Sequence, residues 1–308
     1  MQNRKRLIDF IKRDWQLYLF LMIPVVYMII FAYLPMGGIV IAFKDYVPRK
    51  GIFGSEWVGF LKCKEFFNSL YFKRTLLNTL ILSVYSIIVG FPIPVIMALM
   101  LNCLKSKLTK NVVQTIVTLP HFISTVVLVG IMFQIFSARN GLYGNVVLAL
   151  TGSYPPDPFS IPSNFRHFYV WSGVWQEFGW GSIIYLASLS TIDPHLHEAA
   201  IIDGASRFKR VVYIDLPGIL PTVIIMLILR MGRVMSIGFE KVFLMQNGIN
   251  LQYSEIISTY VYKVGLAAGG TTDFSYATAI GFFNSIINMI LIVIVNAISR
   301  KVSENSLW

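Results

Sequence analysis

Long apolar runs leave this chain few ways to fold. Six of them can cross the ~30 Å hydrocarbon core of a bilayer as helices that rise ~1.5 Å per residue. The runs cover residues 16–41, 75–103, 112–136, 167–191, 218–238 and 276–299. Hydrophobic residues make up 56% of the 308 positions, more than one water-soluble core of this size could hide. We therefore predict an all-α membrane protein with six transmembrane helices.

The charged residues lie mainly at the ends of these runs. Membrane topology therefore explains the formal charge of +11 better than a nucleic-acid partner, which would need a clustered basic face. Basic residues on the two sides nearly balance, but those of the long loop 44–74 count less than those near the N-terminus. We predict cytoplasmic termini, with an N-terminal segment at 1–15, a transmembrane domain at 16–300 and a tail at 301–308.

The segment 193–217, between the fourth and fifth runs, carries the signals of two short helices. Asp193 can cap a first helix, which opens with a proline. Gly204 should end this helix, because glycine readily adopts the left-handed conformation at helix ends. A second helical stretch, Ser206 to Tyr213, then runs to Pro217. The segment is thus predicted to form a helix–turn–helix on the cytoplasmic face.

The composition of this segment suits contact with a protein partner. Small residues at Ala199, Ala200 and Ala205 would allow a close approach. Polar groups for a partner are offered by Glu198, Asp203, Arg207, Lys209 and Arg210.

The same segment resembles the Glu-Ala-Ala coupling loop in the permease subunits of binding-protein-dependent ABC importers. The matching positions are Glu198, Ala199, Ala200, Asp203, Gly204, Ile214, Leu216 and Pro217. Other stretches resemble the oligosaccharide branch of these permeases, which includes subunits for alginate and rhamnogalacturonan oligosaccharides. They lie at 41–45, 51–54, 78–79, 119–124, 179–187 and 307–308.

This resemblance implies a type I importer in the bacterial cytoplasmic membrane. It implies a second, different permease subunit, an extracellular solute-binding protein, an oligosaccharide substrate and two cytoplasmic ATPases that bind ATP and Mg²⁺. The chain contains no phosphate-binding loop, so we do not expect it to hydrolyse a nucleotide by that machinery. The resemblance implies a translocation subunit that is not an enzyme and holds no cofactor of its own. The residues implied to couple to the ATPase are Glu198, Ala199, Ala200, Asp203, Gly204, Ala205, Arg207, Leu216 and Pro217.

Charged residues inside the apolar runs are candidates for a substrate pathway. Arg230 and Arg233 are three apart in the fifth run and would share one helix face, while Glu177 lies near mid-depth in the fourth. In one interpretation Glu177 pairs with Arg230, and Arg233 extends to the membrane interface. In the other, both guanidinium groups line a cavity and bind the carboxylates of an acidic, uronate-containing oligosaccharide.

Three further residues carry the same ambiguity. Asn284 and Asn288 share a face of the sixth run, and Trp175 lies in the fourth. Each could contact a sugar, although asparagine often joins membrane helices and tryptophan often anchors them at the interface. The histidines and cysteines show no metal-ligand spacing, so no metal site is predicted.

A secondary transporter or channel that needs no ATPase is the main alternative. Such a protein would not require the coupling loop and often contains inverted repeats, which are not evident here. A membrane-embedded enzyme would need catalytic residues clustered on facing helices, and no such cluster is evident. The sequence therefore favours the ABC permease.

Overall fold

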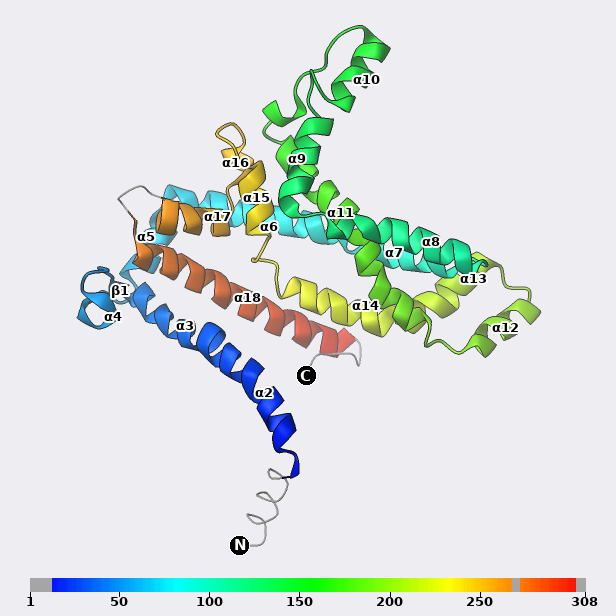
Figure 1. The fold of residues 1–308 in the computed structure, drawn as a ribbon, viewed down its shortest axis with the longest axis horizontal. Coiled ribbons are helices and arrows are strands. Elements are labelled where there is room, and N and C mark those ends of the chain that lie inside the picture. The colour runs from blue at the N-terminus through cyan, green and yellow to red at the C-terminus, as the bar shows by residue number, and fades with distance from the viewer. Residues whose placement is uncertain (1–12, 268–271, 303–308) are drawn as a thin grey trace. The chain divides into compact units, whose positions relative to one another are not determined.

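The computed structural model describes residues 13–267 and 272–302, whose path Figure 1 shows. The chain divides into two compact units. The first comprises Met1–Phe67 and Val264–Phe282, and the second comprises Asn68–Lys263 and Phe283–Trp308. Most of the predicted N-terminal segment 1–15 and of the tail 301–308 lies outside the described residues.

The first unit combines a long apolar helical run with a small β-hairpin. The run Trp15–Phe43 consists of α2 (Trp15–Met28), η1 (Ile29–Tyr33), α3 (Leu34–Met36) and η2 (Gly37–Phe43), and none of its most apolar window is buried within the chain. The hairpin region holds β1 (Lys44–Asp45), α4 (Gly51–Gly54), the antiparallel partner β2 (Glu56–Trp57) and α5 (Leu61–Asn68). Lys62 Nζ lies 2.9 Å from Asp273 and 3.4 Å from Asp45, so one lysine joins α5 to the hairpin and to the residue before α18 (Phe274–Val302).

The second unit is a bundle of helices. The elements that make up its long helices are α6 (Leu70–Gly90), α7 (Pro92–Asn102), α8 (Lys107–Thr118), η3 (Leu119–Phe122), α9 (Thr125–Ile135), α11 (Asn164–Leu189), α14 (Leu216–Met231) and the later part of α18. Shorter elements are α10 (Leu142–Thr151), η4 (Pro158–Ser160), α12 (Pro194–Ile202), α13 (Arg207–Arg210), η5 (Val211–Asp215), α15 (Phe239–Met245), α16 (Leu251–Ser254) and α17 (Ile257–Tyr262), whereas η6 (Lys263–Ala267) belongs almost entirely to the first unit. Figure 1 shows α7 running beside α11, with which it packs.

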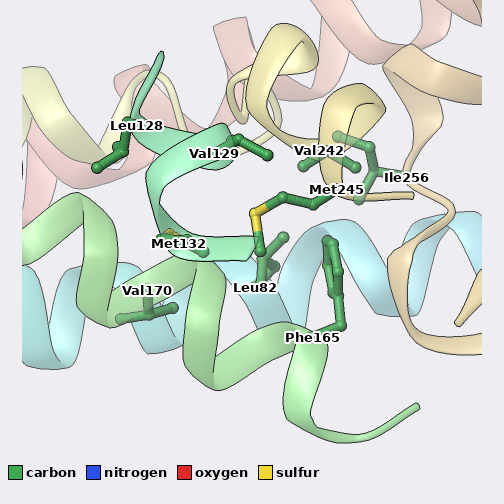
Figure 2. Packing of buried hydrophobic residues seen from close by; sticks show 9 residues of the cluster. All are labelled: Leu82, Leu128, Val129, Met132, Phe165, Val170, Val242, Met245 and Ile256. Atoms are coloured by element: carbon green, nitrogen blue, oxygen red, sulfur yellow. The ribbon is translucent and has the colours of Figure 1, made fainter. Parts of the chain in front are cut away.

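Two apolar clusters hold this bundle together. In the first, drawn in Figure 2, side chains of α6, α9, α11 and α15 converge. Its members are Leu82, Leu128, Val129, Met132, Phe165, Val170, Val242, Met245 and Ile256. The second cluster joins α7, α11 and α14 through Val95, Ala98, Leu101, Tyr185, Leu186, Leu189 and Ile219. The helix α11 contributes to both clusters and is therefore the central element of the unit.

A buried carboxylate ties the segment after α16 to the start of α6. Glu255 is only 4% exposed and pairs with Arg74 and with Lys263, the latter at 3.1 Å. Asn78 donates from its side chain to the backbone carbonyls of Gln252, at 2.9 Å, and Glu255, at 3.1 Å. Because a buried carboxylate is stable only when its charge is compensated, these contacts fix the segment against the bundle.

The apolar spans are fewer than the six predicted runs. Among the described residues, four helices are long and apolar enough to cross a membrane: Trp15–Phe43, Leu70–Asn102, Arg207–Met231 and Phe274–Arg300. A fifth is counted if Lys107–Phe122 and Thr125–Ile135, which bend by 97°, form one broken span. The fourth predicted run, 167–191, does form the long helix α11, but its glycines and polar residues keep it outside this apolar set. The chain is a predominantly helical membrane protein.

The third and fifth runs differ from the prediction for local reasons. In the third, Pro120 falls in a 3₁₀ turn, and Ser124 caps α9 by accepting from Val127 N, so one helix ends and another begins. The fifth was expected at 218–238, but its helix starts upstream at Arg207 and ends at Met231.

Candidate functional site

The helix–turn–helix predicted around Gly204 is present. Asp193 accepts a hydrogen bond from His195 N at 3.0 Å and caps α12. Gly204 adopts a φ of +72°, and Ala205 N bonds back to Ala200 O at 2.8 Å, so the turn closes as a left-handed helix terminus. These are local signals, which explains why they were readable from the sequence.

The second half of the segment is more continuous than expected. The chain does not break before Pro217: α13, η5 and α14 form one helix from Arg207 to Met231. Leu216 N donates to Val211 O, five residues earlier, which is the wider π-type turn. Pro217 has no N–H to give and would crowd the preceding turn of a regular α-helix, and a π turn at this point accommodates it. A displacement of α13 would therefore pass directly into α14.

Apolar residues on either side of Gly204 are exposed. None of α12 is buried, and Ile202 and Phe208 are 86% and 77% exposed. The side chain of Glu198 is also exposed and lies 3.2 Å from His195 Nδ1. Exposed aliphatic and aromatic groups beside small residues form a surface suited to a protein partner.

A buried acid connects this segment to the bundle. Asp215 is 3% exposed, lies 3.2 Å from His197 Nε2 of α12 and accepts from Asn102 Nδ2 of α7 at 3.4 Å. The sequence indicates no role for His197, because its partner is eighteen positions away and outside any helical spacing. In the fold, this histidine ties α12 to α7 and to the helix that continues into α14.

A hollow of about 540 Å³ lies within the second unit. Its walls come from α6, α7, the start of α9, α11, the end of α14, the stretch between α14 and α15, and α15 itself. Its charged lining residues are Glu177, Arg230, Arg233, Glu240 and Lys241. A volume of this size falls in the ~300–1,000 Å³ range of small-molecule sites.

Arg230 is held by backbone carbonyls. Its Nη2 donates to Ser86 O at 3.0 Å, and its Nη1 approaches Gly90 O at 3.4 Å. A Cβ atom at Gly90 would lie only 3.0 Å from Nη2, so the glycine makes room for the guanidinium group. Arg233 was predicted to share a helix face with Arg230, and this prediction is wrong. The helix α14 ends at Met231, and Arg233 lies exposed in the following turn. Both arginines nevertheless line the same hollow.

Glu177 does not form the predicted ion pair with Arg230. Its carboxylate lies 3.2 Å from His121 Nδ1, and the imidazole stacks on Trp180 with ring centroids 4.3 Å apart. Within residues 13–267 and 272–302, no carboxylate lies within 4 Å of the Arg230 guanidinium. Carbonyl oxygens orient this cation but do not neutralise its charge.

Lys241 is a cation of the hollow that the sequence analysis missed. Its Nζ donates to Tyr169 O at 2.9 Å and lies 4.9 Å from the centre of the Tyr169 ring. The residue is only 9% exposed, and Gly173 leaves space for its ammonium group. The one available signal was the charged pair Glu240 and Lys241 among the apolar residues of 239–245, a pattern that does not show which hollow the lysine side chain reaches.

The remaining candidates are divided among different environments. Asn288 accepts from Met235 N at 2.9 Å and donates to Ser236 Oγ at 2.8 Å, so it holds the turn that carries Arg233. Asn284 has a buried Oδ1 with no hydrogen-bond partner in the described part of the chain. Trp175 lines a different hollow, of about 590 Å³, on the α9 side of α11.

Apolar spans, a cationic hollow among the helices and an exposed helix–turn–helix are together the features of a membrane transport permease. Residues 90–304 match the family of the binding-protein-dependent transport system inner membrane component, and the chain belongs to this family. It is therefore a transport permease subunit, with the type I ABC importer permease fold.

Similar proteins match along nearly the whole chain. Protein LplB of Bacillus subtilis (strain 168) is 42% identical over 301 residues, which cover 97% of this chain and 92% of that protein. The polygalacturonan/rhamnogalacturonan transport system permease protein YteP of the same organism is 39% identical, over 100% of this chain and 94% of the relative. A chain in the crystal structure of a bacterial alginate ABC transporter, in complex with its alginate pentasaccharide-bound periplasmic protein, superposes with a TM-score of 0.88 at 36% identity, covering 98% and 100% of the two chains.

Proposed function

We propose that this chain is a permease subunit of an ATP-driven importer for acidic, uronate-containing oligosaccharides. In this proposal residues 16–300 form six membrane-crossing helices of the bacterial cytoplasmic membrane, and 1–15, 193–217 and 301–308 face the cytoplasm. A second, different permease completes the pathway, and an extracellular solute-binding protein delivers the sugar. Two ATPases bind ATP and Mg²⁺, so the hydrolysis takes place outside this chain. The polygalacturonan and alginate named for two relatives support the acidic substrate.

The uncompensated charge of the hollow is the observation that carries the substrate class. Arg230, Arg233 and Lys241 line it, and in the described part of the chain none has a carboxylate within 4 Å. Lys241 is only 9% exposed, and a charge removed from water in this way is costly unless a counter-charge reaches it. The carboxylates of a uronate chain would supply that counter-charge, and a guanidinium group can bind one through two hydrogen bonds.

The geometry of segment 193–217 supports coupling to a separate ATPase. Ile202 and Phe208 form an exposed apolar surface at the turn, and Asp215 ties that turn to α7 through Asn102. An ATPase that moves α12 would shift α14 through the contact between His197 and Asp215, because Asp215 belongs to the continuous helix formed by α13, η5 and α14. Since α14 carries Arg230 into the hollow, closure of the ATPases would reach the substrate site through a single rigid element.

The test compares a charged sugar with its neutral form. In the reconstituted transporter, Arg233→Gln should raise the KM for an oligogalacturonide about 10- to 100-fold, because a hydrogen bond between charged groups contributes about 1.5–3 kcal/mol. Uptake of the fully methyl-esterified oligogalacturonide should change little. Arg233→Lys should restore part of the affinity, and Arg139→Gln, an exposed arginine outside the hollow, is the matched control. Equal effects on the charged and esterified sugars would refute the acidic substrate class.

A further inference from the structure

A second polar hollow lies beside the coupling segment. It measures about 380 Å³ and is formed by three parts of the chain: the end of α7 with the loop that follows, α12, and the helix that starts at α13. Its polar lining residues are Asn102, Lys105, His197, Arg207, Arg210 and Asp215. It is separate from the transport hollow, which is the cavity of about 540 Å³ lined by Arg230, Arg233 and Lys241, and the two share no lining residue.

The charge of this second hollow is positive. Its one carboxylate, Asp215, already contacts His197 and Asn102. Lys105, Arg207 and Arg210 have no carboxylate within 4 Å among the described residues, and Arg210 Nε is buried without a hydrogen-bond partner there. A buried N–H donor without an acceptor is unfavourable by about 1–3 kcal/mol, so a ligand with several acceptor oxygens would be stabilised here.

The position of the hollow indicates where such a ligand comes from. One apolar span, Leu70–Asn102, ends at its edge, and another, Arg207–Met231, begins there. The ends of spans lie where the hydrocarbon core gives way to the lipid phosphates. Leu104 and Ile201, both partly exposed apolar residues, also line the hollow. Basic pockets between the ends of membrane helices bind phospholipid head groups by this combination of cationic and apolar walls.

We propose that this hollow is a binding site for a phosphate-bearing anion, supplied by the head group of an anionic phospholipid. The phosphate oxygens accept from Arg210 and Lys105, and the first acyl carbons lie along Leu104 and Ile201. A bound head group then joins the loop after α7 to α12 and α13, so it stiffens the coupling segment. Lipid binding at this site needs neither the sugar nor the ATPase. The lipid belongs to the inner leaflet because the proposed function places segment 193–217 on the cytoplasmic side, and this part of the inference rests on that orientation.

Lipid retention by the purified full-length chain tests the site. The chain is exchanged into nanodiscs or detergent that contains phosphatidylglycerol or phosphatidylcholine, and the lipid that stays bound is measured by native mass spectrometry. Wild type should retain phosphatidylglycerol, and Lys105→Gln/Arg210→Gln should retain it at least about tenfold less well. The control Arg49→Gln/Lys50→Gln removes two exposed charges from the hairpin loop and should retain the lipid like wild type.

Further measurements distinguish a lipid head group from free inorganic phosphate and show whether the variants still fold. If inorganic phosphate at millimolar concentration displaces phosphatidylglycerol from wild type, the phosphate chemistry is supported and the pocket accepts soluble phosphate as well. The single change Lys105→Gln affects an exposed residue and should lower retention without altering the circular dichroism spectrum, while Arg210→Lys should recover part of it. Equal retention by wild type and the double variant refutes the site. So does unchanged retention combined with weaker ATPase co-purification, because the cations would then serve the ATPase.

Discussion

Replacing Gly204 with valine should lower both sugar uptake and the stimulated ATPase activity while the protein still enters the membrane. Gly204 has a φ of +72°, and an added Cβ would meet no atom within 4 Å. The added Cβ therefore creates no clash within the chain, and the expected effect comes from the backbone conformation. An L-residue in this region is disfavoured by about 1–2 kcal/mol, and a β-branched residue by more.

The size of the effect follows from that strain. About 2 kcal/mol corresponds to a roughly 30-fold shift away from the native turn, because 1.4 kcal/mol is a factor of ten. Alanine should lose about 1 kcal/mol, and asparagine only a few tenths, because its side chain tolerates the left-handed region. We expect binding-protein-stimulated ATPase activity and sugar uptake to fall in the order glycine, asparagine, alanine, valine.

The ranking of asparagine and alanine separates two explanations. If Gly204 is needed for its conformation, the larger asparagine should outperform the smaller alanine. If it is needed only because a partner approaches closely, alanine should be the better substitute. The assay is uptake and ATPase activity in proteoliposomes, with membrane insertion checked by fractionation. Wild-type activity in the valine variant would refute the reasoning.

Three further changes probe other parts of the chain. Glu198→Lys should weaken co-purification with the ATPase about tenfold, because an exposed acceptor on α12 becomes a cation. Glu255→Gln should lower the melting temperature in detergent by about 5 °C, because Arg74 and Lys263 lose the buried carboxylate that they share. Lys241→Gln should reduce uptake of an oligogalacturonide several-fold more than uptake of its methyl ester, because one cation of the transport hollow is removed.

Each of these changes has a matched comparison. Glu198→Gln keeps the shape of the side chain and should retain most of the association. Glu240→Gln removes an exposed carboxylate and should leave the melting temperature unchanged. Lys241→Arg keeps the charge and should preserve the preference for the acidic sugar. The role of Glu198 would be contradicted if Glu198→Lys still associated normally with the ATPase. The role of Glu255 would be contradicted by an unaltered melting temperature of Glu255→Gln, and that of Lys241 by an unaltered sugar preference of Lys241→Gln.

Local features of the sequence were sufficient to predict the coupling turn. The cap at Asp193 and the left-handed Gly204 depend only on residues within one helical turn, so neighbouring residues specify them. The apolar runs were equally readable, because burial in a bilayer requires length and hydrophobicity rather than a particular partner. The ends of the runs were predicted less accurately, because Pro120 interrupts the third run and α14 stops at Met231 instead of residue 238.

Tertiary structure alone decided which charges meet. Glu177 contacts His121 instead of Arg230, and Lys241, which lies outside the six predicted runs, reaches the transport hollow. The sequence by itself determined that this is a helical membrane protein with a helix–turn–helix around Gly204, since periodicity and capping act over a few residues. It did not determine the lining of either hollow, because those contacts join helices far apart in the chain, and their pairing depends on how the whole bundle packs.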